Sequence, residues 1–407
     1  MIIKTLLVHP GTQYSHQLAK QLYKRNLLYL FISGFIISEN SILLRCIRKF
    51  IPNLYRIISN RVIKELPPSK LKSFFFNEIF SLIKLRNSNL ELNYFERNNL
   101  FQKKIPGSIL KNSTIIIGFD TSSLLLIEHA LKLNIPFILD VSIAHSIEKN
   151  HVYRNLMHSF PNWAEFIELK DEQLIEIEQL EFLKATKLVV ASNFTKQTLI
   201  NQGITAEKIH VNPYGINLTD FKMKEQYLLN QKIKFIFIGL VDARKGVPFL
   251  LSVMGQLDQK LLELNLIGPV SSPIKSIIET NYSSLSINVL GKVPHAEMSE
   301  LIILNDVFVF PTYFEGFGLV ILEAMASGLP VITTTASAGP DIIQNGIEGF
   351  VIEPGNEEEL KTAMQYFIDH PEQIEIMGKA ARKKAEQYTW DSYGKRWEKI
   401  IMDVLHK

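Results

Sequence analysis

The sequence contains a single cysteine, Cys46, among its 407 residues. One cysteine cannot form an intramolecular disulfide, a multi-cysteine zinc site or an iron–sulfur cluster. The ten histidines show no spacing typical of metal ligands. Because disulfides are characteristic of oxidising compartments, this composition favours a cytoplasmic protein without a structural metal site.

Long apolar runs are also lacking. The longest, from Leu27 to Ile37, has about half the length of a membrane-spanning helix. The apolar stretch at the amino terminus is too short for a secretion signal. We therefore expect no transmembrane helix in a protein that is cytoplasmic, either free or bound peripherally to the inner face of the membrane.

The net charge is only +3, but it is unevenly distributed. Residues 1–215 hold 26 basic and 17 acidic residues, whereas residues 216–407 hold 18 and 24. Most of the basic excess lies in residues 41–76, whose single acidic residue is Glu65. The basic residues of this segment are Arg45, Arg48, Lys49, Arg56, Arg61, Lys64, Lys70 and Lys72, and the interleaved aromatic residues are Phe50, Tyr55, Phe74, Phe75 and Phe76.

Three interpretations of the basic segment 41–76 stay open. It is suited to rest on an anionic bilayer, to bind an acidic or lipid-linked substrate, or to form an ordinary solvated surface with core aromatics. Nucleic acid is not an expected partner, because the total charge is small and no nucleic-acid-binding motif is present.

Short β-branched runs alternate with helical patterns along nearly the whole chain. The predicted strands are Ile3–His9, Thr114–Phe119, Pro136–Asp140, Leu188–Ala191, Ile209–Pro213, Phe235–Gly239, Leu264–Gly268, Ile287–Leu290, Val307–Phe310, Val331–Thr334 and Phe350–Ile352. Runs of Val and Ile with little alternation indicate strands that are covered on both faces. The pattern predicts an α/β protein with parallel sheets and crossover helices.

A polar stretch, Asn217–Lys234, divides the chain into two doubly wound parts. We predict one Rossmann-like domain over residues 1–215 and a second over residues 216–388. Residues 389–407 form an amphipathic pattern with Trp390 and Trp397, and we expect this final helix to pack back on the first domain.

The strongest motif runs from Pro311 to Ile332, where a predicted strand, a glycine-containing loop and a helix follow one another. The loop contains Glu315, Gly316 and Gly318. We expect the two glycines to let the backbone approach a ligand, and the helix start to direct amides toward an anion. Loops at the carboxyl ends of parallel strands are where open α/β sheets bind ligands.

Glu323 follows Glu315 by eight residues, and we expect both carboxylates to border one crevice. A carboxylate accepts hydrogen bonds and so suits the hydroxyls of a sugar or ribose. A surface position is the alternative for Glu323, but its neighbours in the helix are apolar or small, and a carboxylate in such a setting needs a partner.

A second motif, Arg244-Lys245-Gly246, follows the first predicted strand of the second domain. Two adjacent cations at a strand–loop–helix junction suit a diphosphate. An effective dielectric of about 20 gives each cation roughly 4 kcal/mol of attraction for a phosphate charge about 4 Å away, before desolvation.

These motifs resemble the retaining glycosyltransferases of the GT-B fold, specifically glycosyltransferase family four (glycosyl transferases group 1). The resemblance extends from about Glu178 to Tyr393 and becomes fainter upstream. Further matching segments are Ala185–Phe194, His210–Ile216, Leu266–Gly268, Gly291–Pro294, Gly349–Pro354 and Thr389-Trp390. The ordered series carries the resemblance, since two glutamates with this spacing alone are weakly specific.

The resemblance implies two Rossmann-like domains that face each other across a cleft, with a nucleoside-diphosphate sugar held mainly by the second. Arg244 and Lys245 would neutralise the diphosphate, Glu323 would bind the ribose and Glu315 the transferring sugar. The remaining donor-binding positions it implies are Gly316, the amides of Phe317, Gly318, Leu319 and Val320, Val293 beside the base, and Gly11 from the opposite domain.

The resemblance also implies a catalytic role for His145, which matches a histidine that related enzymes place beside the donor sugar. A cleft-wall or core histidine without such a role is the alternative. Gly11 departs from the family pattern, because it stands alone between Pro10 and Thr12 where paired glycines are frequent.

No Asp-x-Asp motif occurs in the sequence, so we expect no metal and a leaving group stabilised by cations and helix amides. The predicted function is sugar transfer to a hydroxyl acceptor such as a glycan or a glycolipid. A nucleotide-sugar epimerase of the same fold and a non-catalytic sugar-nucleotide-binding subunit are the alternatives. A dehydrogenase is disfavoured, since no Gly-x-Gly-x-x-Gly follows the first strand.

Overall fold

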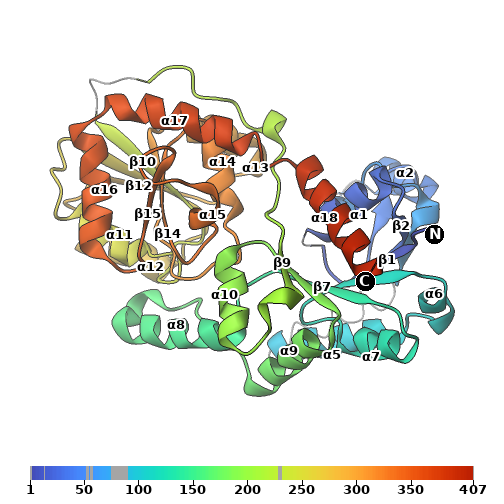
Figure 1. Ribbon diagram of the computed structural model, residues 1–407. Coiled ribbons are helices and arrows are strands. Elements are labelled where there is room, and N and C mark those ends of the chain that lie inside the picture. Colours follow the sequence, from blue (N-terminus) through green and yellow to red (C-terminus); the bar gives the residue numbers. More distant parts are fainter. Residues whose placement is uncertain are drawn as a thin grey trace.

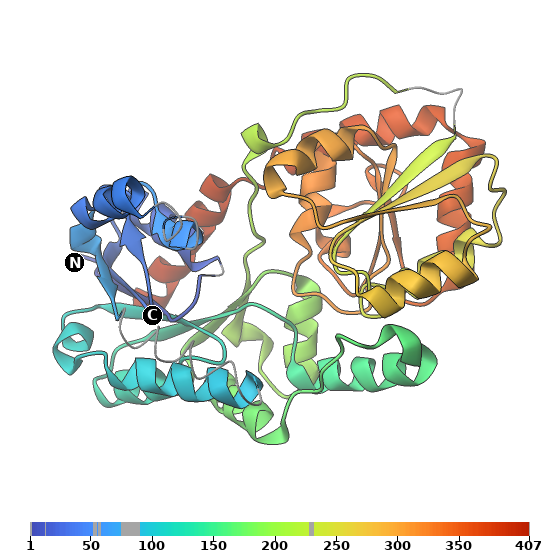
Figure 2. The same ribbon diagram turned by 180° about the vertical axis from the view of Figure 1, so that it is seen from behind.

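The computed structural model describes residues 2–12, 14–51, 55, 58–74, 90–227 and 232–406. It contains two parallel sheets, each flanked by helices, in two lobes (Figures 1 and 2). Arg56, Phe75 and Phe76 of the basic segment lie outside the described residues. The two sheets with their crossover helices confirm the GT-B fold that the sequence predicts.

The first lobe is built on a seven-stranded sheet with the order β5-β2-β1-β6-β7-β8-β9. Its strands are β1 (Thr5–His9), β2 (Leu28–Ser33), β5 (Leu71–Ser73), β6 (Ile115–Phe119), β7 (Phe137–Val141), β8 (Lys187–Val190) and β9 (Ile209–Val211). A separate two-stranded sheet pairs β3 (Ile37–Ser38) with β4 (Val62–Ile63). Strands β1, β6 and β7 are buried along their whole length, as expected for strands covered on both faces.

Helices cover both faces of this sheet (Figure 1). They are α1 (Ser15–Lys24), α2 (Ile42–Phe50), α5 (Leu90–Lys103), α6 (Gly107–Lys111), α7 (Leu124–Lys132), α8 (Ser146–Ser159), α9 (Glu172–Lys184) and α10 (Asn193–Asn201). Short 3-10 turns are η1 (Ser59–Arg61), η2 (Pro68–Lys70), η3 (Pro161–Trp163), η4 (Ala206–Lys208) and η5 (Leu218–Asp220). Helix α8 extends beneath the second lobe in both views (Figures 1 and 2).

The second lobe is built on a six-stranded sheet with the order β12-β11-β10-β13-β14-β15. Its strands are β10 (Ile233–Ile238), β11 (Leu262–Ile267), β12 (Ile287–Gly291), β13 (Val307–Phe310), β14 (Val331–Thr334) and β15 (Gly349–Ile352). The helices after β10 are α11 (Val247–Met254), α12 (Ser272–Asn281), α13 (His295–Ile303), α14 (Leu319–Ala326), α15 (Gly339–Ile342), α16 (Glu357–Asp369), α17 (Glu372–Ala385) and α18 (Trp390–Leu405).

Every strand range predicted from the sequence overlaps a strand of the structure. Strand β2 was not predicted, because its leucine-rich stretch lies in the apolar run that was weighed only as a membrane span. Its burial beside β1 accounts for that run.

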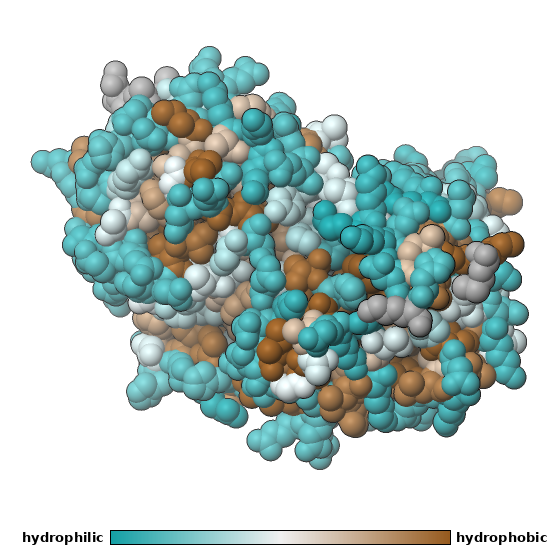
Figure 3. All heavy atoms as spheres, in the orientation of Figure 1, coloured by the Kyte–Doolittle hydropathy of each residue, from teal (hydrophilic) through white to brown (hydrophobic). Residues whose placement is uncertain are grey.

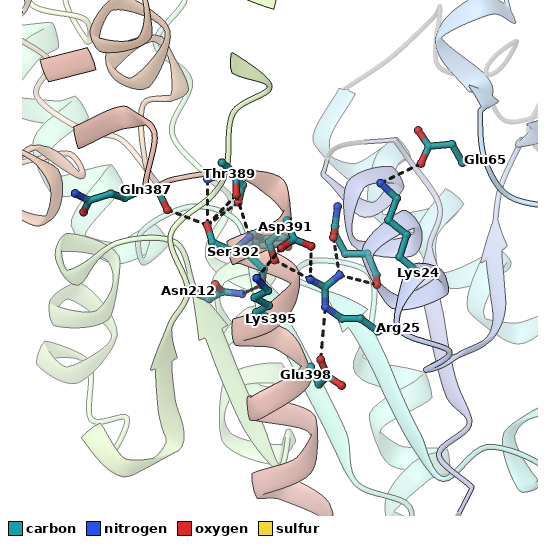
Figure 4. Close-up of polar contacts among 12 residues, drawn as sticks. Lys24, Arg25, Glu65, Asn212, Gln387, Thr389, Asp391, Ser392, Lys395 and Glu398 are labelled. Atoms are coloured by element: carbon teal, nitrogen blue, oxygen red, sulfur yellow. Dashed lines mark hydrogen bonds and ion pairs between the residues drawn. The ribbon is translucent and has the colours of Figure 1, made fainter. Parts of the chain in front are cut away.

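The last helix, α18, leaves the second lobe and packs against α1 of the first (Figure 4). Arg25 at the end of α1 donates to the Asp391 carboxylate at 2.7 Å and lies 3.6 Å from that of Glu398. Thr389 and Ser392 form a capping box that fixes where α18 begins. The face shown in Figure 3 is mostly hydrophilic and is interrupted by small apolar patches.

Two chain segments connect the lobes, and they run side by side. The Ile216 amide donates to the Tyr388 carbonyl at 2.8 Å, and Ile216 forms a parallel bridge with Thr389. A Cβ on Gly215 would lie 2.3 Å from the Trp390 amide nitrogen, so the crossing requires glycine. These paired connections are the covalent links between the lobes.

Candidate functional site

Arg244, Lys245 and Glu315 converge at the carboxyl ends of β10 and β13. The Lys245 ammonium forms a close ion pair with the Glu315 carboxylate, and Arg244 Nη1 lies 3.3 Å from the same oxygen, Glu315 Oε1. Gly246, with φ +75°, begins α11, and a Cβ there would lie 2.0 Å from the Pro311 carbonyl oxygen. The close approach of the two loops brings the cations of one to the carboxylate of the other.

Asp242 contacts the loop that carries Arg244 and Lys245. The sequence analysis did not single it out. It is fully buried, its Oδ1 accepts from the Lys245 amide at 2.8 Å, and its Oδ2 lies 3.9 Å from Arg244 Nε. Burial raises the pKa of Asp242, and the Arg244 guanidinium opposes that rise. A turn-forming aspartate just before two cations is the signal that could have identified it.

Lys245 is exposed over only 12 % of its side chain. Burial and the adjacent Arg244 lower the pKa of Lys245, while Asp242 raises it. The contact with Glu315 also favours the charged ammonium. The site therefore holds two cations that a carboxylate partly neutralises, beside the first turn of α14.

Gly316, where the sequence suggested the close approach of a ligand, lies at a contact between the lobes. A Cβ there would lie 2.2 Å from the Ser142 carbonyl oxygen in the first lobe. The Gly316 carbonyl also accepts from Ser192 Oγ at 2.6 Å and Thr195 Oγ1 at 3.1 Å, both at the start of α10. The loop that contains Glu315 is thus fastened to the opposite lobe.

Gly318 begins α14 with φ +87°, a conformation that favours glycine. The first amides of a helix have no acceptor within it, so those of Leu319 and Val320 are available to an anion at this end. The Phe317 side chain is buried, and its ring packs against Tyr214 with the centroids 5.4 Å apart. Phe317 therefore presents its backbone rather than its ring to the site.

Glu323 lies on α14, and the charges that act on it come from different residues than those around Glu315. Burial raises the pKa of Glu323, and His295 at the start of α13 opposes that rise. Burial raises the pKa of Tyr14 in the first lobe, and Glu323 adds to that rise. The two glutamates therefore have different charged neighbours: Arg244 and Lys245 contact Glu315, whereas His295 acts on the pKa of Glu323.

His145, for which the resemblance implied a role beside the donor sugar, is fully buried. Its Nδ1 accepts from the Ile147 amide at 3.1 Å and so caps α8, while its Nε2 lies 2.9 Å from Gln179 Oε1. The ring packs against Phe182. Both ring nitrogens of His145 are therefore engaged within the first lobe, an arrangement that also suits the alternative of a core histidine.

The two remaining predicted positions are Val293 and Gly11. Val293 follows β12 and is partly buried against the core of the second lobe. Gly11 follows β1 and lines a cavity of about 530 Å³ in the first lobe. A Cβ on Gly11 would lie 3.1 Å from the ring nitrogen Nε2 of His9.

A second contact between the lobes was also missed by the sequence analysis. Asn193 donates to the Asp341 carboxylate through its amide at 2.8 Å and its side chain at 2.6 Å. Two ring contacts adjoin it, since Tyr153 and Phe194 of the first lobe pack edge-on against Phe314. Asn193 and Asp341 lie so far apart in the sequence that no local pattern predicts their contact.

Helix α2, in the basic segment, carries an exposed face of mixed apolar and basic character. Ile42 and Phe50 are 74 % and 71 % exposed, and Cys46 between them is also exposed. Arg45 and Lys49 adjoin this row, and α2 contains no acidic residue. Within the described parts of the chain, no helix is long and apolar enough to cross a membrane.

Residues 219–384 match the family model described as "Glycosyl transferases group 1". A sulfoquinovosyl transferase, SQD2 of Arabidopsis thaliana, is 36 % identical over 39 % of this chain and 31 % of its own length. Sucrose-phosphate synthase from Thermosynechococcus elongatus superposes with a TM-score of 0.67 at 16 % identity, covering 99 % of both chains. Anabaena HepE, solved in complex with UDP and glucose, superposes with a TM-score of 0.63 at 15 % identity, covering 98 % of this chain and 100 % of its own.

The chain spans between about a third and three fifths of the lengths of the curated relatives it matches, with shares of 31 %, 59 %, 52 % and 59 %. The structural matches cover both lobes and therefore extend the likeness in fold beyond the region that the family model matches.

Proposed function

We propose that the protein is a retaining glycosyltransferase, on the premise that residues 219–384 match the family model described as "Glycosyl transferases group 1". It moves a sugar from a nucleoside-diphosphate sugar to a hydroxyl of a glycan or lipid-linked acceptor. The observation that carries the proposal is the convergence of Arg244, Lys245 and Glu315 beside the first turn of α14.

The donor is held by the second lobe. The diphosphate lies against Arg244 and Lys245, and the first amides of α14 reach its oxygens. Glu315 binds the transferring sugar and Glu323 the ribose hydroxyls, since carboxylates accept from hydroxyl groups. The base lies on the side of Val293, which follows β12 at the same edge of the sheet.

Sugar transfer proceeds by stabilisation of the leaving group. As the bond to the diphosphate breaks, the released negative charge is met by two fixed cations and by helix amides that require no reorganisation. The acceptor hydroxyl attacks the same face of an oxocarbenium-like sugar and gives its proton to the departing diphosphate. Asp242 keeps both cations in position throughout.

The decisive experiment is a screen of UDP, GDP and ADP by thermal shift, followed by assays with the sugar forms of the nucleotide that binds. A bound donor raises the melting temperature. Transfer requires an acceptor, so product that forms without any acceptor would identify an epimerase instead. Failure of all three nucleotides to bind would refute the proposal.

A metal is not part of the proposed reaction, because Arg244 and Lys245 supply the positive charge. We expect full activity in excess EDTA. Loss of activity in EDTA and its recovery with Mn²⁺ would contradict this part of the proposal.

The exposed face of α2 rests on an anionic membrane. Ile42 and Phe50 insert between headgroups while Arg45 and Lys49 meet lipid phosphates, as in other interfacial helices. This placement brings the first lobe to a membrane-embedded acceptor.

A further inference from the structure

A cavity of about 530 Å³ lies in the first lobe at the carboxyl ends of β1 and β6 and opens to solvent. This β1–β6 cavity is lined by Gly11 in the loop after β1, by Asn98 of α5, by Thr121 in the turn after β6, and by Leu174 and Ile177 of α9. Because these segments are distant in the sequence, the cavity exists only in the folded sheet.

The position of the cavity in the first sheet is one at which open α/β sheets bind ligands. From β1 the chain proceeds to β2 and then to β5 on one side, and from β6 it proceeds to β7, β8 and β9 on the other. The loops that follow β1 and β6 therefore lead away from each other and leave a crevice at the carboxyl edge of the sheet.

The candidate donor site has the same position in the second sheet. There the strand order reverses between β10 and β13, and the loops that follow these two strands carry Lys245 and Glu315. Sugar transfer needs two substrates. The β1–β6 cavity is the equivalent crevice in the other lobe.

Thr121 has a backbone conformation that threonine rarely adopts. Its φ is +65°, and it is the only β-branched residue with a positive φ in the described part of the chain. The Thr121 amide donates to Glu181 Oε2 at 2.7 Å, and the Thr121 carbonyl accepts from Asn98 Nδ2 at 3.1 Å. Two helices, α9 and α5, thus hold the turn in place. Backbone strain that is fixed in this way clusters at ligand sites.

Two polar groups of the cavity wall lack a partner. Thr121 is exposed, and its hydroxyl makes no hydrogen bond within the described residues. Asn98 is only 8 % exposed, and its Oδ1 has no hydrogen-bond partner in the parts of the chain that the structure describes. The hydroxyls of a ligand can satisfy both groups, whereas a deprotonated oxyanion has no proton to donate to the amide oxygen of Asn98.

The charged side chains of the wall are already engaged within the protein. Lys170 forms a close ion pair with Glu178, and Arg97 donates to the Pro10 carbonyl at 3.0 Å. Arg61 also has an interaction within the chain. The groups that remain for a ligand are therefore mainly neutral.

Part of this neutral wall is apolar. Tyr94 and Phe95 of α5 and Leu174 and Ile177 of α9 line the cavity beside the polar groups. Several apolar side chains with a few polar groups are typical of sites for small organic ligands. A sugar ring suits such a wall, because the ring has hydroxyls at its rim and C–H groups on its faces.

The cavity opens at the edge of the first sheet that contacts the donor loop. Asp120, directly before Thr121, accepts from Ser142 Oγ at 2.9 Å. A Cβ on Gly316 would lie 2.2 Å from the Ser142 carbonyl oxygen, so Ser142 is packed against the loop that contains Glu315. A short series of contacts therefore connects Thr121 with the donor loop.

We propose that the β1–β6 cavity binds a sugar ring of the acceptor and that the Thr121 hydroxyl contacts this ring. The inference rests on the proposed function and adds that the acceptor presents a glycosyl group to the first lobe. That group can be the end of a glycan or the head group of a glycolipid, which share the same ring chemistry.

The test is calorimetric titration of the full chain with the methyl glycosides of glucose, galactose, mannose and N-acetylglucosamine. Sorbitol, which has hydroxyls but no ring, is the reference. UDP, GDP or ADP, whichever binds most tightly, is present at saturation so that the probe does not occupy the donor site. We expect at least one glycoside to bind about tenfold or more tightly than sorbitol.

Thr121→Gly removes the hydroxyl and relieves the strained φ, while the hydrogen bonds of the turn persist because they involve the backbone of this residue. We expect it to weaken binding of the glycoside about three- to tenfold without lowering the melting temperature. Thr121→Ser retains the hydroxyl and should keep most of the affinity. A residue with a structural role alone would not give affinities that follow the hydroxyl in this way.

Asn134→Gly is the matched control. Asn134 also has a positive φ, +54°, but it is exposed after the end of α7 and does not line the cavity. Its replacement should leave glycoside binding unchanged.

The glycoside that binds best is then titrated as its disaccharide and as its hexyl glycoside. Tighter binding of the disaccharide indicates a glycan acceptor, and tighter binding of the hexyl form indicates a glycolipid.

The inference is overturned if no methyl glycoside binds more tightly than sorbitol, or if Thr121→Gly binds the glycoside as well as the wild type does. Nucleotide binding is measured separately. If nucleotides bind and the glycosides do not, only the sugar site in the β1–β6 cavity is refuted; if no nucleotide binds, the proposed function itself fails.

Discussion

The Glu315 carboxylate contacts the same two cations that are proposed to hold the diphosphate. A nucleoside diphosphate must therefore compete with it. Replacing Glu315 by Gln removes that competition, so we expect nucleotide affinity to rise about tenfold, a change of 1.4 kcal/mol. Turnover should fall about a hundredfold, because the contact with the transferring sugar is weakened. Calorimetry and initial rates measure the two effects.

Glu297→Gln, at an exposed position in the first turn of α13, is the control for loss of one negative charge. It should change neither nucleotide affinity nor turnover. A Glu315→Gln enzyme with normal turnover would exclude Glu315 from the reaction, while weakened nucleotide binding would show that its carboxylate aids rather than opposes the diphosphate.

Asp120 predicts how stability depends on pH. It is buried, and burial together with Glu178 raises its pKa from 3.8 to about 7, although Ser142 and Lys170 oppose the rise. Between these two values the folded carboxyl keeps a proton that the unfolded one has released. The contribution of Asp120 to the free energy of unfolding is therefore present below about pH 4 and is lost as the pH rises to 7.

The isosteric change Asp120→Asn removes this titration while its Oδ1 still accepts from Ser142. As the pH rises from 4 to 7, we expect the free energy of unfolding of the variant to increase by a few kcal/mol relative to that of the wild type. Urea unfolding at pH 5 and pH 8 measures the difference. Burial lowers the pKa values of His9 and His16 to about 3 and about 4, and their opposite contributions to stability are the same in both proteins and cancel. An equal difference at both pH values would show that the folded pKa of Asp120 is not raised.

At the residue scale, the sequence predicted those candidate site residues that a local pattern identifies. Arg244, Lys245 and Glu315 were found because each follows a recognisable strand. Their contact joins loops 70 residues apart and depends on the pairing of β10 with β13, which no spacing reveals. The sequence position of His145 likewise does not show that its side chain caps α8.

At the scale of elements, α2 is the helix whose exposed face most needs a partner. Changing both Ile42 and Phe50 to Ser should lower binding to phosphatidylglycerol vesicles at least tenfold, since each buried apolar side chain contributes about 1.5–3 kcal/mol. Changing Arg45 and Lys49 to Gln should also weaken vesicle binding, by about 1 kcal/mol per charge. This second effect should appear only with anionic vesicles. Sedimentation with vesicles measures both.

Ile376→Ser is the matched control, because Ile376 is 58 % exposed on α17 of the other lobe. It should not alter sedimentation. If the wild type and the variant with Ile42 and Phe50 changed to Ser bind the vesicles equally well, α2 is an ordinary solvated helix.

Elements with strong periodic or β-branched patterns were predictable, and those fixed by tertiary context were not. Val307–Phe310 is a buried run between turn residues, and its predicted bounds match those of β13. Strands β3 and β5 have two and three residues, too few to carry a pattern, and exist only because neighbouring backbone pairs with them. Short strands of this kind are set by the sheet rather than by propensity.

At the scale of the whole molecule, the contact between the lobes at Gly316 leaves no room for a side chain, since a Cβ there would lie 2.2 Å from the Ser142 carbonyl oxygen. We predict that Gly316→Ala pushes the lobes apart. It would also weaken the hydrogen bonds that the Gly316 carbonyl accepts from Ser192 and Thr195. Arg244 and Lys245 stay in place within the second lobe, so nucleotide binding should persist while turnover falls on the order of a hundredfold.

Small-angle scattering should show a larger radius of gyration for Gly316→Ala in the presence of nucleotide. Gly107→Ala is the control, because a Cβ at Gly107 meets nothing within 4 Å. Lobe closure excludes water from the reacting sugar, so the open variant should also hydrolyse a larger share of the donor it consumes. Normal turnover in Gly316→Ala would mean that sugar transfer does not need the lobes held this close, and the fastening of the Glu315 loop to α10 would then serve stability alone.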